Sequence, residues 1–179
     1  TLENWWKIPD QVSFGRFERL APREARTPPR FVFAATISTH VPFVRVPPYQ
    51  PDWQRLLDEQ PLDATQVARE MARPVDWIDM MPVYVRLIDY TYRWLGGYLR
   101  QPRPRDTVYV LLGDHQPTAN VTGEGASWDV PVHVVSSDPQ LLQRFVELGF
   151  VAGLEPPRTP LGGMHELTGM LLQAFDGAP

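Results

Sequence analysis

The chain has 179 residues, of which 43% are hydrophobic and 21% are charged, as in an ordinary globular domain. Its net charge of −4 leaves no basic surplus, so we expect neither nucleic acid nor an anionic membrane surface as a partner of this segment. Cysteine is absent, which excludes disulfides, thiolate metal sites and a cysteine nucleophile within these residues. No run of about 18 apolar residues could span a bilayer.

Residues 1–30 show no regular hydrophobic period and are predicted to form an irregular N-terminal arm or linker. Residues 20–30 are rich in proline and arginine, and proline disfavours a helix at the residue before it. This stretch is either a solvated loop or a docking arm for another part of a parent protein. No signal-peptide pattern is visible at the start of the chain. Because the chain begins with Thr1 and not with Met, we expect either a processed form or a piece of a longer protein.

Three short apolar runs predict strands, at residues 31–37, 106–112 and 130–135. The first two are almost continuously apolar, which is typical of strands that a parallel sheet buries on both faces. Helices are predicted for residues 52–60, 64–73, 81–100, 137–148 and 163–175. The alternation of strands and helices predicts an α/β fold, with a mostly parallel sheet and helices on both of its faces.

The predicted helix over residues 81–100 is the longest in the chain. Its apolar residues recur at steps of three and four, and the predicted inward stripe includes Leu87 and Tyr92. Asp89 falls on the same stripe, so it is expected to pair with a cation or to lie at the edge. Asp52 and Asp63 are predicted to cap the two preceding helices.

Polar residues that suit a metal or phosphate site follow the first two predicted strands. Thr39 and His40 follow the first, and Asp114 and His115 follow the second. Parallel strands bring such residues to one rim of the sheet, where α/β proteins bind ligands. A carboxylate beside an imidazole suits Zn²⁺ or Mn²⁺. The alternative is that Asp114 caps a turn and His115 is a surface residue.

The remaining candidates are less specific. His40 could donate to a phosphate oxygen or act as a general acid, with Phe43 pinning its loop, or it could be a structural histidine. His133 alternates with valines and fits a structural role, and His165 fits a surface position near a helix start. Trp128 lies in a predicted open loop over residues 118–128, where it is either a rim residue or a ligand contact.

Five segments, taken in order, resemble lipoteichoic acid synthases and related sulfatase-like membrane enzymes. FVFAATISTHVPF (31–43) resembles their strand and T-x-S-x-H-x-P-F loop, and TVYVLLGDH (107–115) resembles their strand ending in Asp-His. The helix at 84–99, the Val-Pro strand at 130–135 and the helix at 165–177 resemble the other landmarks. Residues 31–179 therefore resemble the C-terminal part of a catalytic domain in the sulfatase-like branch of the alkaline phosphatase superfamily.

The resemblance implies an incomplete alkaline phosphatase-like α/β domain that cleaves or transfers phosphate or sulfate esters. It implies that Asp114 and His115 bind a divalent metal (Mn²⁺, Zn²⁺ or Mg²⁺) and that His40, with Thr39, binds the substrate phosphate. Asp-His resembles the phosphotransferase members more than the true sulfatases. The parent protein is expected to be membrane-anchored, to act outside the cytoplasm and to serve cell-envelope metabolism.

The chain also departs from the family pattern. The family nucleophile and its first metal carboxylate come from an upstream segment, and residues 1–30 contain no counterpart. Gln116 stands where the family has glycine, and Glu166 replaces a late aspartate. We therefore expect the isolated chain to be inactive without the N-terminal half of its parent domain. The alternatives are a noncatalytic binding or scaffold domain of the same fold, and an unrelated α/β domain.

Overall fold

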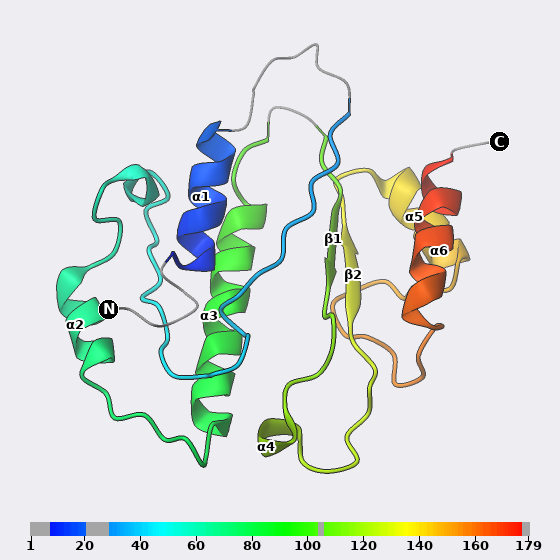
Figure 1. The fold of residues 1–179 in the computed structure, drawn as a ribbon. Coiled ribbons are helices and arrows are strands. Elements are labelled where there is room, and N and C mark those ends of the chain that lie inside the picture. The colour runs from blue at the N-terminus through cyan, green and yellow to red at the C-terminus, as the bar shows by residue number, and fades with distance from the viewer. Residues whose placement is uncertain (1–7, 21–28, 104–105, 177–179) are drawn as a thin grey trace. The chain divides into compact units, whose positions relative to one another are not determined.

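The computed structural model describes residues 8–20, 29–103 and 106–176. Within them the chain forms six α-helices, two 3-10 helices and two strands (Figure 1). These residues divide into two compact units. The first unit comprises the described residues of Thr1–Pro102 and Pro117–Ala126, and the second those of Arg103–Gln116 and Ser127–Pro179.

The sheet, which belongs to the second unit, corrects the predicted fold class. Strand β1 (Tyr109–Leu112) pairs with β2 (Val132–Val135), and the two strands run antiparallel. Tyr109 lies opposite Val135, and Leu112 lies opposite Val132. The predicted mostly parallel sheet with helices on both faces is therefore wrong for the described part of the chain. A parallel pair needs a crossover connection, whereas a loop is enough to join an antiparallel pair.

Residues 31–37, the first predicted strand, are not part of this sheet. Phe31 is 90% exposed and Phe33 is 83% exposed, so their side chains are not the buried ones that the apolar run predicted. An apolar run favours an extended backbone, but a strand forms only where a second segment supplies hydrogen-bond partners. In the described residues, the partner of β1 is β2.

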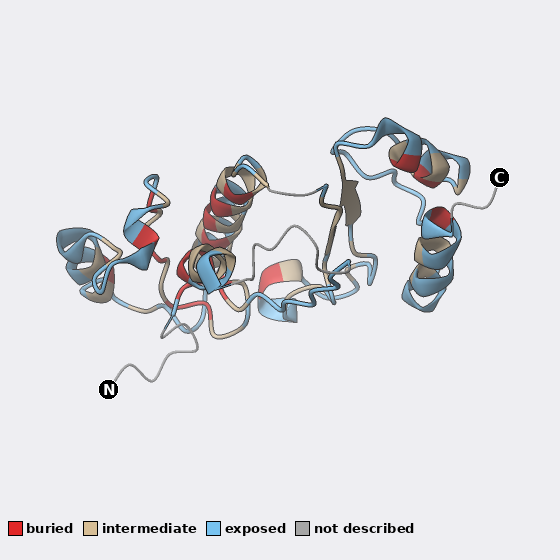
Figure 2. Ribbon diagram, turned by 90° about the horizontal axis from the view of Figure 1, so that it is seen from above, coloured by how far each residue is buried: buried red, intermediate tan, exposed pale blue. Residues whose placement is uncertain are grey.

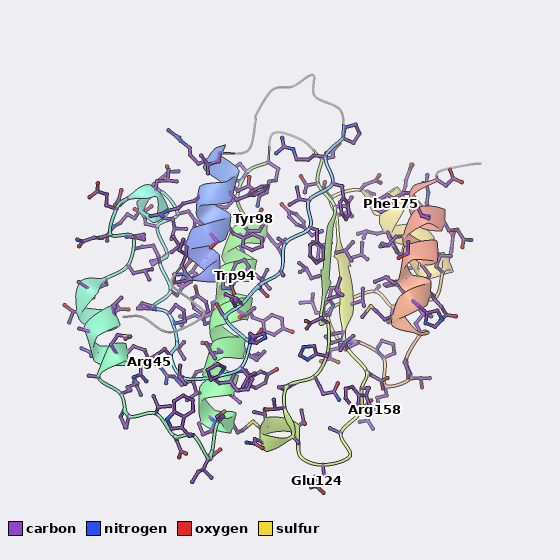
Figure 3. All side chains as sticks on the ribbon, viewed as in Figure 1. Arg45, Trp94, Tyr98, Glu124, Arg158 and Phe175 are labelled. Carbon is purple, nitrogen blue, oxygen red and sulfur yellow. The ribbon has the colours of Figure 1, made fainter. Side chains whose placement is uncertain are left out.

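Helix α1 (Asp10–Leu20) lies within the stretch that the sequence predicted to be irregular. Together with α3 (Met81–Leu99), it builds the aromatic core of the first unit. The ring of Phe14 lies 4.8 Å from the ring of Trp94 and 5.2 Å from that of Tyr98. Trp94 and Tyr98 are both side chains of α3 (Figure 3). Isolated helices of this length are marginal in water, so the packing of Phe14 against α3 stabilises α1.

Helix α3 confirms the predicted long helix, and Pro82 lies in its first turn, where proline is favoured. Its buried face differs from the predicted stripe. The buried positions of α3 are Leu87, Tyr90, Trp94 and Tyr98. Figure 2 colours buried residues red. Tyr92, which was predicted to face inward, is 60% exposed. Asp89 is exposed and lies 3.8 Å from Arg93, so the expectation that it pairs is confirmed.

Helix α2 (Ala64–Met71) was predicted, and so was its cap. The Asp63 carboxylate accepts the Gln66 backbone N–H at 2.7 Å. The predicted helix over residues 52–60 is reduced to the 3-10 helix η1 (Arg55–Leu57). Leu56 is the buried residue of that segment, which is too little apolar surface to stabilise a longer helix.

A second core cluster of the first unit surrounds Phe43. The ring of Phe43 is 1% exposed and meets the ring of Tyr84 edge-on, with 4.9 Å between the centroids. Leu87 and Met80 complete this cluster together with Val121, which comes from the short helix α4 (Ala119–Thr122). Helix α4 lies inside the predicted open loop, so part of that loop is ordered.

The second unit also contains helices α5 (Pro139–Glu147) and α6 (Leu167–Phe175), with the 3-10 helix η2 (Met164–Glu166) before α6. The sequence predicts either Ser137 or Asp138 as the cap of α5, and the Asp138 carboxylate is the one that accepts the Gln140 N–H, at 2.8 Å. The buried core residues of this unit are Leu141, Phe145 and Ala174. The spacing of apolar residues along this helix also predicts Val146 on the inward face, but Val146 is 41% exposed. Among the described helices of both units, none combines the length and apolarity that a membrane span requires.

Candidate functional site

The Asp114–His115 pair follows β1 directly in the second unit. The Gly113 N–H donates to the Pro131 carbonyl at 3.2 Å, which extends the pairing of the strands by one residue. A Cβ atom at Gly113 would lie 3.3 Å from the Cβ of Val130, so the close approach of these two segments favours glycine here. Asp114 and His115 begin where the pairing ends, and both side chains are exposed.

The two side chains are oriented toward each other. Asp114 Oδ2 lies 3.5 Å from His115 Nε2. Two ligands that share a tetrahedral Zn²⁺ with bonds of 2.0–2.2 Å lie about 3.4 Å apart. The observed separation therefore suits a carboxylate oxygen and an imidazole nitrogen that bind the same ion.

The other imidazole nitrogen of His115 also suits a metal ligand. His115 Nδ1 lies 2.8 Å from the Gln116 carbonyl oxygen. In the tautomer that carries its proton on Nδ1, the ring donates to this carbonyl and Nε2 presents its lone pair. Metal-bound histidines are commonly oriented by such a hydrogen bond on the second nitrogen. The Asp114 carboxylate is held in turn by the His115 backbone N–H, at 3.0 Å from Oδ1.

The pair is not a complete coordination shell. No group of three or more His, Cys, Asp or Glu residues that could hold a metal occurs in the part of the chain that the structure describes. Asp114 and His115 fit two ligand positions, and a bound ion would take its other ligands from water, substrate or further residues.

Thr39 and His40 lie in a tight turn of the first unit. The His40 backbone N–H donates to the Ile37 carbonyl at 3.0 Å, which closes the turn. Thr39 is half-buried and the His40 side chain is exposed, with Nδ1 2.5 Å from the Val41 carbonyl oxygen. A histidine in this position can present Nε2 to an oxyanion.

This turn is anchored on both sides. Before it, the carboxylate of Asp10 accepts the Ile37 N–H at 3.0 Å and the Ser38 N–H at 2.8 Å. After it, Phe43 is buried in its core cluster, as the proposed pinning of the loop requires. Asp10 lies within residues 1–30, which the sequence predicts to be irregular, so sequence analysis does not single it out. An acidic residue just ahead of apolar residues is a helix-start signal that could have indicated α1, although not the contact of Asp10 with the turn.

The structure brings together the residues of each candidate pair and assigns the two pairs to different units. Thr39 and His40 belong to the first unit, and Asp114 and His115 to the second. The prediction that all four meet on one rim relied on parallel strands, and the described strands are antiparallel. That derivation therefore no longer holds.

The other sequence candidates show no comparable arrangement. His133 is half-buried in β2 opposite Leu111. His165 is exposed in η2, beside Glu166, whose carboxylate accepts the Gly163 N–H at 2.7 Å. Trp128 is 80% exposed. These positions leave the Asp114–His115 pair as the best-supported candidate.

Comparison of the chain with models of protein families, with curated proteins and with solved structures gives no match. The functional argument therefore depends on the residues and their geometry.

Proposed function

We propose that this chain is part of a metal-dependent, sulfatase-like hydrolase or phosphotransferase that acts on phosphate or sulfate esters. The observation that carries the proposal is the geometry of Asp114 and His115. Their ligand atoms are 3.5 Å apart, and the second nitrogen of His115 faces a carbonyl oxygen. The ordered motifs that resemble lipoteichoic acid synthases support the same reaction class.

In this proposal, the Asp114 carboxylate and His115 Nε2 are two ligands of a divalent metal. Such a metal activates a nucleophilic oxygen and neutralises negative charge that develops on the ester. Because His40 Nδ1 faces the Val41 carbonyl oxygen, His40 takes part as an imidazolium that donates from Nε2 to an oxygen of the phosphate, and Thr39 contributes to the same binding step. The nucleophile and the remaining carboxylate come from outside these residues, so the chain by itself is expected not to turn over substrate. Action in the cell envelope follows from the resemblance.

Metal binding tests the proposal directly. Mn²⁺ and Zn²⁺ are titrated by calorimetry into the wild-type chain, into an Asp114→Ala, His115→Ala variant and into a His165→Ala, Glu166→Ala variant. The last variant is a matched control, because it removes another exposed pair of adjacent acidic and histidine side chains. Saturable binding should be lost in the first variant and retained in the control. Equal binding in all three proteins would contradict the proposal.

A noncatalytic binding or scaffold domain is the second candidate. It is favoured by the incomplete ligand set among the described residues. Under this hypothesis, neither metal would bind saturably to the wild-type chain, and adding the upstream part of the parent protein would not restore binding. Saturable binding that depends on Asp114 and His115 would exclude it.

A further inference from the structure

The buried carboxylate of Asp10 lies against the backbone of the turn that carries His40. Asp10 is 4% exposed and is the first residue of α1. Oδ1 accepts the Ile37 N–H at 3.0 Å, and Oδ2 accepts the N–H groups of Ile37 and Ser38 at 3.2 and 2.8 Å. Two consecutive backbone donors thus converge on one carboxylate, which is a charge-assisted arrangement roughly twice as strong as a neutral one.

We propose that Asp10 is a positioning residue, which holds the 37–40 turn so that His40 can bind a phosphate oxygen. This inference rests on the proposed function of His40. Ile37 is the first residue of the turn, and its carbonyl accepts the His40 N–H at 3.0 Å. The carboxylate therefore fixes the peptide group at one end of the hydrogen bond that closes the turn. The His40 imidazole is exposed and its Nδ1 lies against the carbonyl oxygen of Val41, the next residue, so the place of the ring follows the backbone of the turn.

The position of the Asp10 carboxylate is fixed by the helix that carries it. Asp10 lies at the N-terminal end of α1, where the helix dipole favours a negative charge. The next residue, Gln11, is 0% exposed, and its side chain donates to and accepts from the Gln50 backbone at 2.6 and 2.9 Å. Helix α1 is thus tied to one neighbouring segment by Gln11 and to the His40 turn by Asp10.

These adjacent contacts provide a matched pair of variants. Asp10→Asn keeps the size of the side chain, but its amide group presents donors where a backbone N–H needs an acceptor. Gln11→Leu removes two buried hydrogen bonds of the same helix and leaves the His40 turn intact. A merely structural role for Asp10 predicts that the two variants lose stability and behave alike at His40.

The experiment follows the His40 ring by NMR in the full chain, with inorganic phosphate as the probe. In the wild type we expect one sharp His40 resonance that shifts saturably with phosphate. In Asp10→Asn it should broaden or move and lose most of its phosphate-induced shift, while Gln11→Leu retains both. If His40 behaves the same in both variants, Asp10 has no positioning role. If the wild-type resonance ignores phosphate but still changes in Asp10→Asn alone, the turn is held as proposed and the phosphate role of His40 is wrong.

A measurement on the wild type covers the case in which Asp10→Asn does not fold. The amide protons of Ile37 and Ser38 should exchange slowly with solvent, because the buried carboxylate accepts both of them. The amide of Phe31, in an exposed part of the same extended segment, is the internal reference. Equally fast exchange at Phe31, Ile37 and Ser38 would overturn the inference.

Discussion

The carboxylate of Glu70 joins three segments of the first unit. Its Oε2 accepts a hydrogen bond from the Arg86 guanidinium of α3 at 2.8 Å, and its Oε1 accepts one from the Val46 backbone N–H at 3.0 Å. Arg73 also lies 2.8 Å from Oε2. Glu70 itself is 8% exposed, so water has little access to its carboxylate. Removing this carboxylate leaves one backbone donor and two cations without their acceptor.

Glu70→Ala should therefore lower the free energy of unfolding by about 1–3 kcal/mol. Arg73→Gln removes one member of the same network, but the Arg73 side chain is 53% exposed. Its cost should be only about 0–1 kcal/mol, as for other solvent-exposed ion pairs. Urea unfolding of the two variants and the wild type measures both values. A larger loss in Arg73→Gln than in Glu70→Ala would show that the buried carboxylate is not the centre of this network.

Trp94 is the most completely enclosed large side chain of the aromatic core, with 0% exposure. Trp94→Ala should cost about 3–5 kcal/mol, since it leaves a cavity beside Phe14 and Tyr98. Trp77 is 61% exposed, so Trp77→Ala should change stability by no more than about 0.5 kcal/mol. Thermal and urea unfolding compare the stabilities of the two variants. Similar losses of stability at the two positions would show that Trp94 is not part of the core.

Two glycines of the second unit should respond to alanine with opposite signs. Gly149 follows α5 with φ of 100°, and a Cβ there would lie 2.6 Å from Cδ1 of Leu161. Gly149→Ala should destabilise by more than about 1 kcal/mol, because L-residues are strained at such a φ. Gly169 lies inside α6, where a Cβ meets nothing within 4 Å. Gly169→Ala should stabilise by about 0.5–1 kcal/mol, and urea unfolding reports both signs.

Ionisation of Tyr90 should limit stability at high pH. Burial raises the pKa of Tyr90 well above its usual range; the nearby Gln11 backbone lowers it in part, and the charge of the Asp10 carboxylate raises it further. In the unfolded chain Tyr90 ionises near its ordinary pKa of about 10, while the folded protein keeps the proton. Above that pH the folded state binds more protons than the unfolded state, so stability falls as the pH rises.

Urea unfolding of the wild type and Tyr90→Phe at pH 7 and at about pH 10.5 tests this expectation. The wild type should lose more stability between the two conditions than Tyr90→Phe does. Tyr92→Phe is the control, because Tyr92 lies on the exposed face of the same helix and should leave the difference unchanged. Equal pH dependence of the wild type and Tyr90→Phe would contradict the assignment of the loss to Tyr90.

The candidate metal pair could be predicted from the sequence because its signal is local. An apolar run that ends in Gly-Asp-His places a carboxylate and an imidazole just beyond a strand, whichever way that strand is paired. Asp10 could not be predicted in the same way. It reaches Ile37 across 27 positions of sequence, and no short-range pattern carries such a contact.

The sequence by itself determined the elements whose signals lie within a few residues. Asp63 and Asp138 are caps because their carboxylates accept backbone N–H groups at the start of their own helix. The long helix α3 follows from the helical period of its apolar residues. Only the tertiary structure decided which face of α3 is buried and that β1 pairs antiparallel with β2. It also left residues 31–37 outside that sheet. These features depend on which distant segment supplies the packing surface or the hydrogen-bond partner, and local hydrophobicity does not encode that choice.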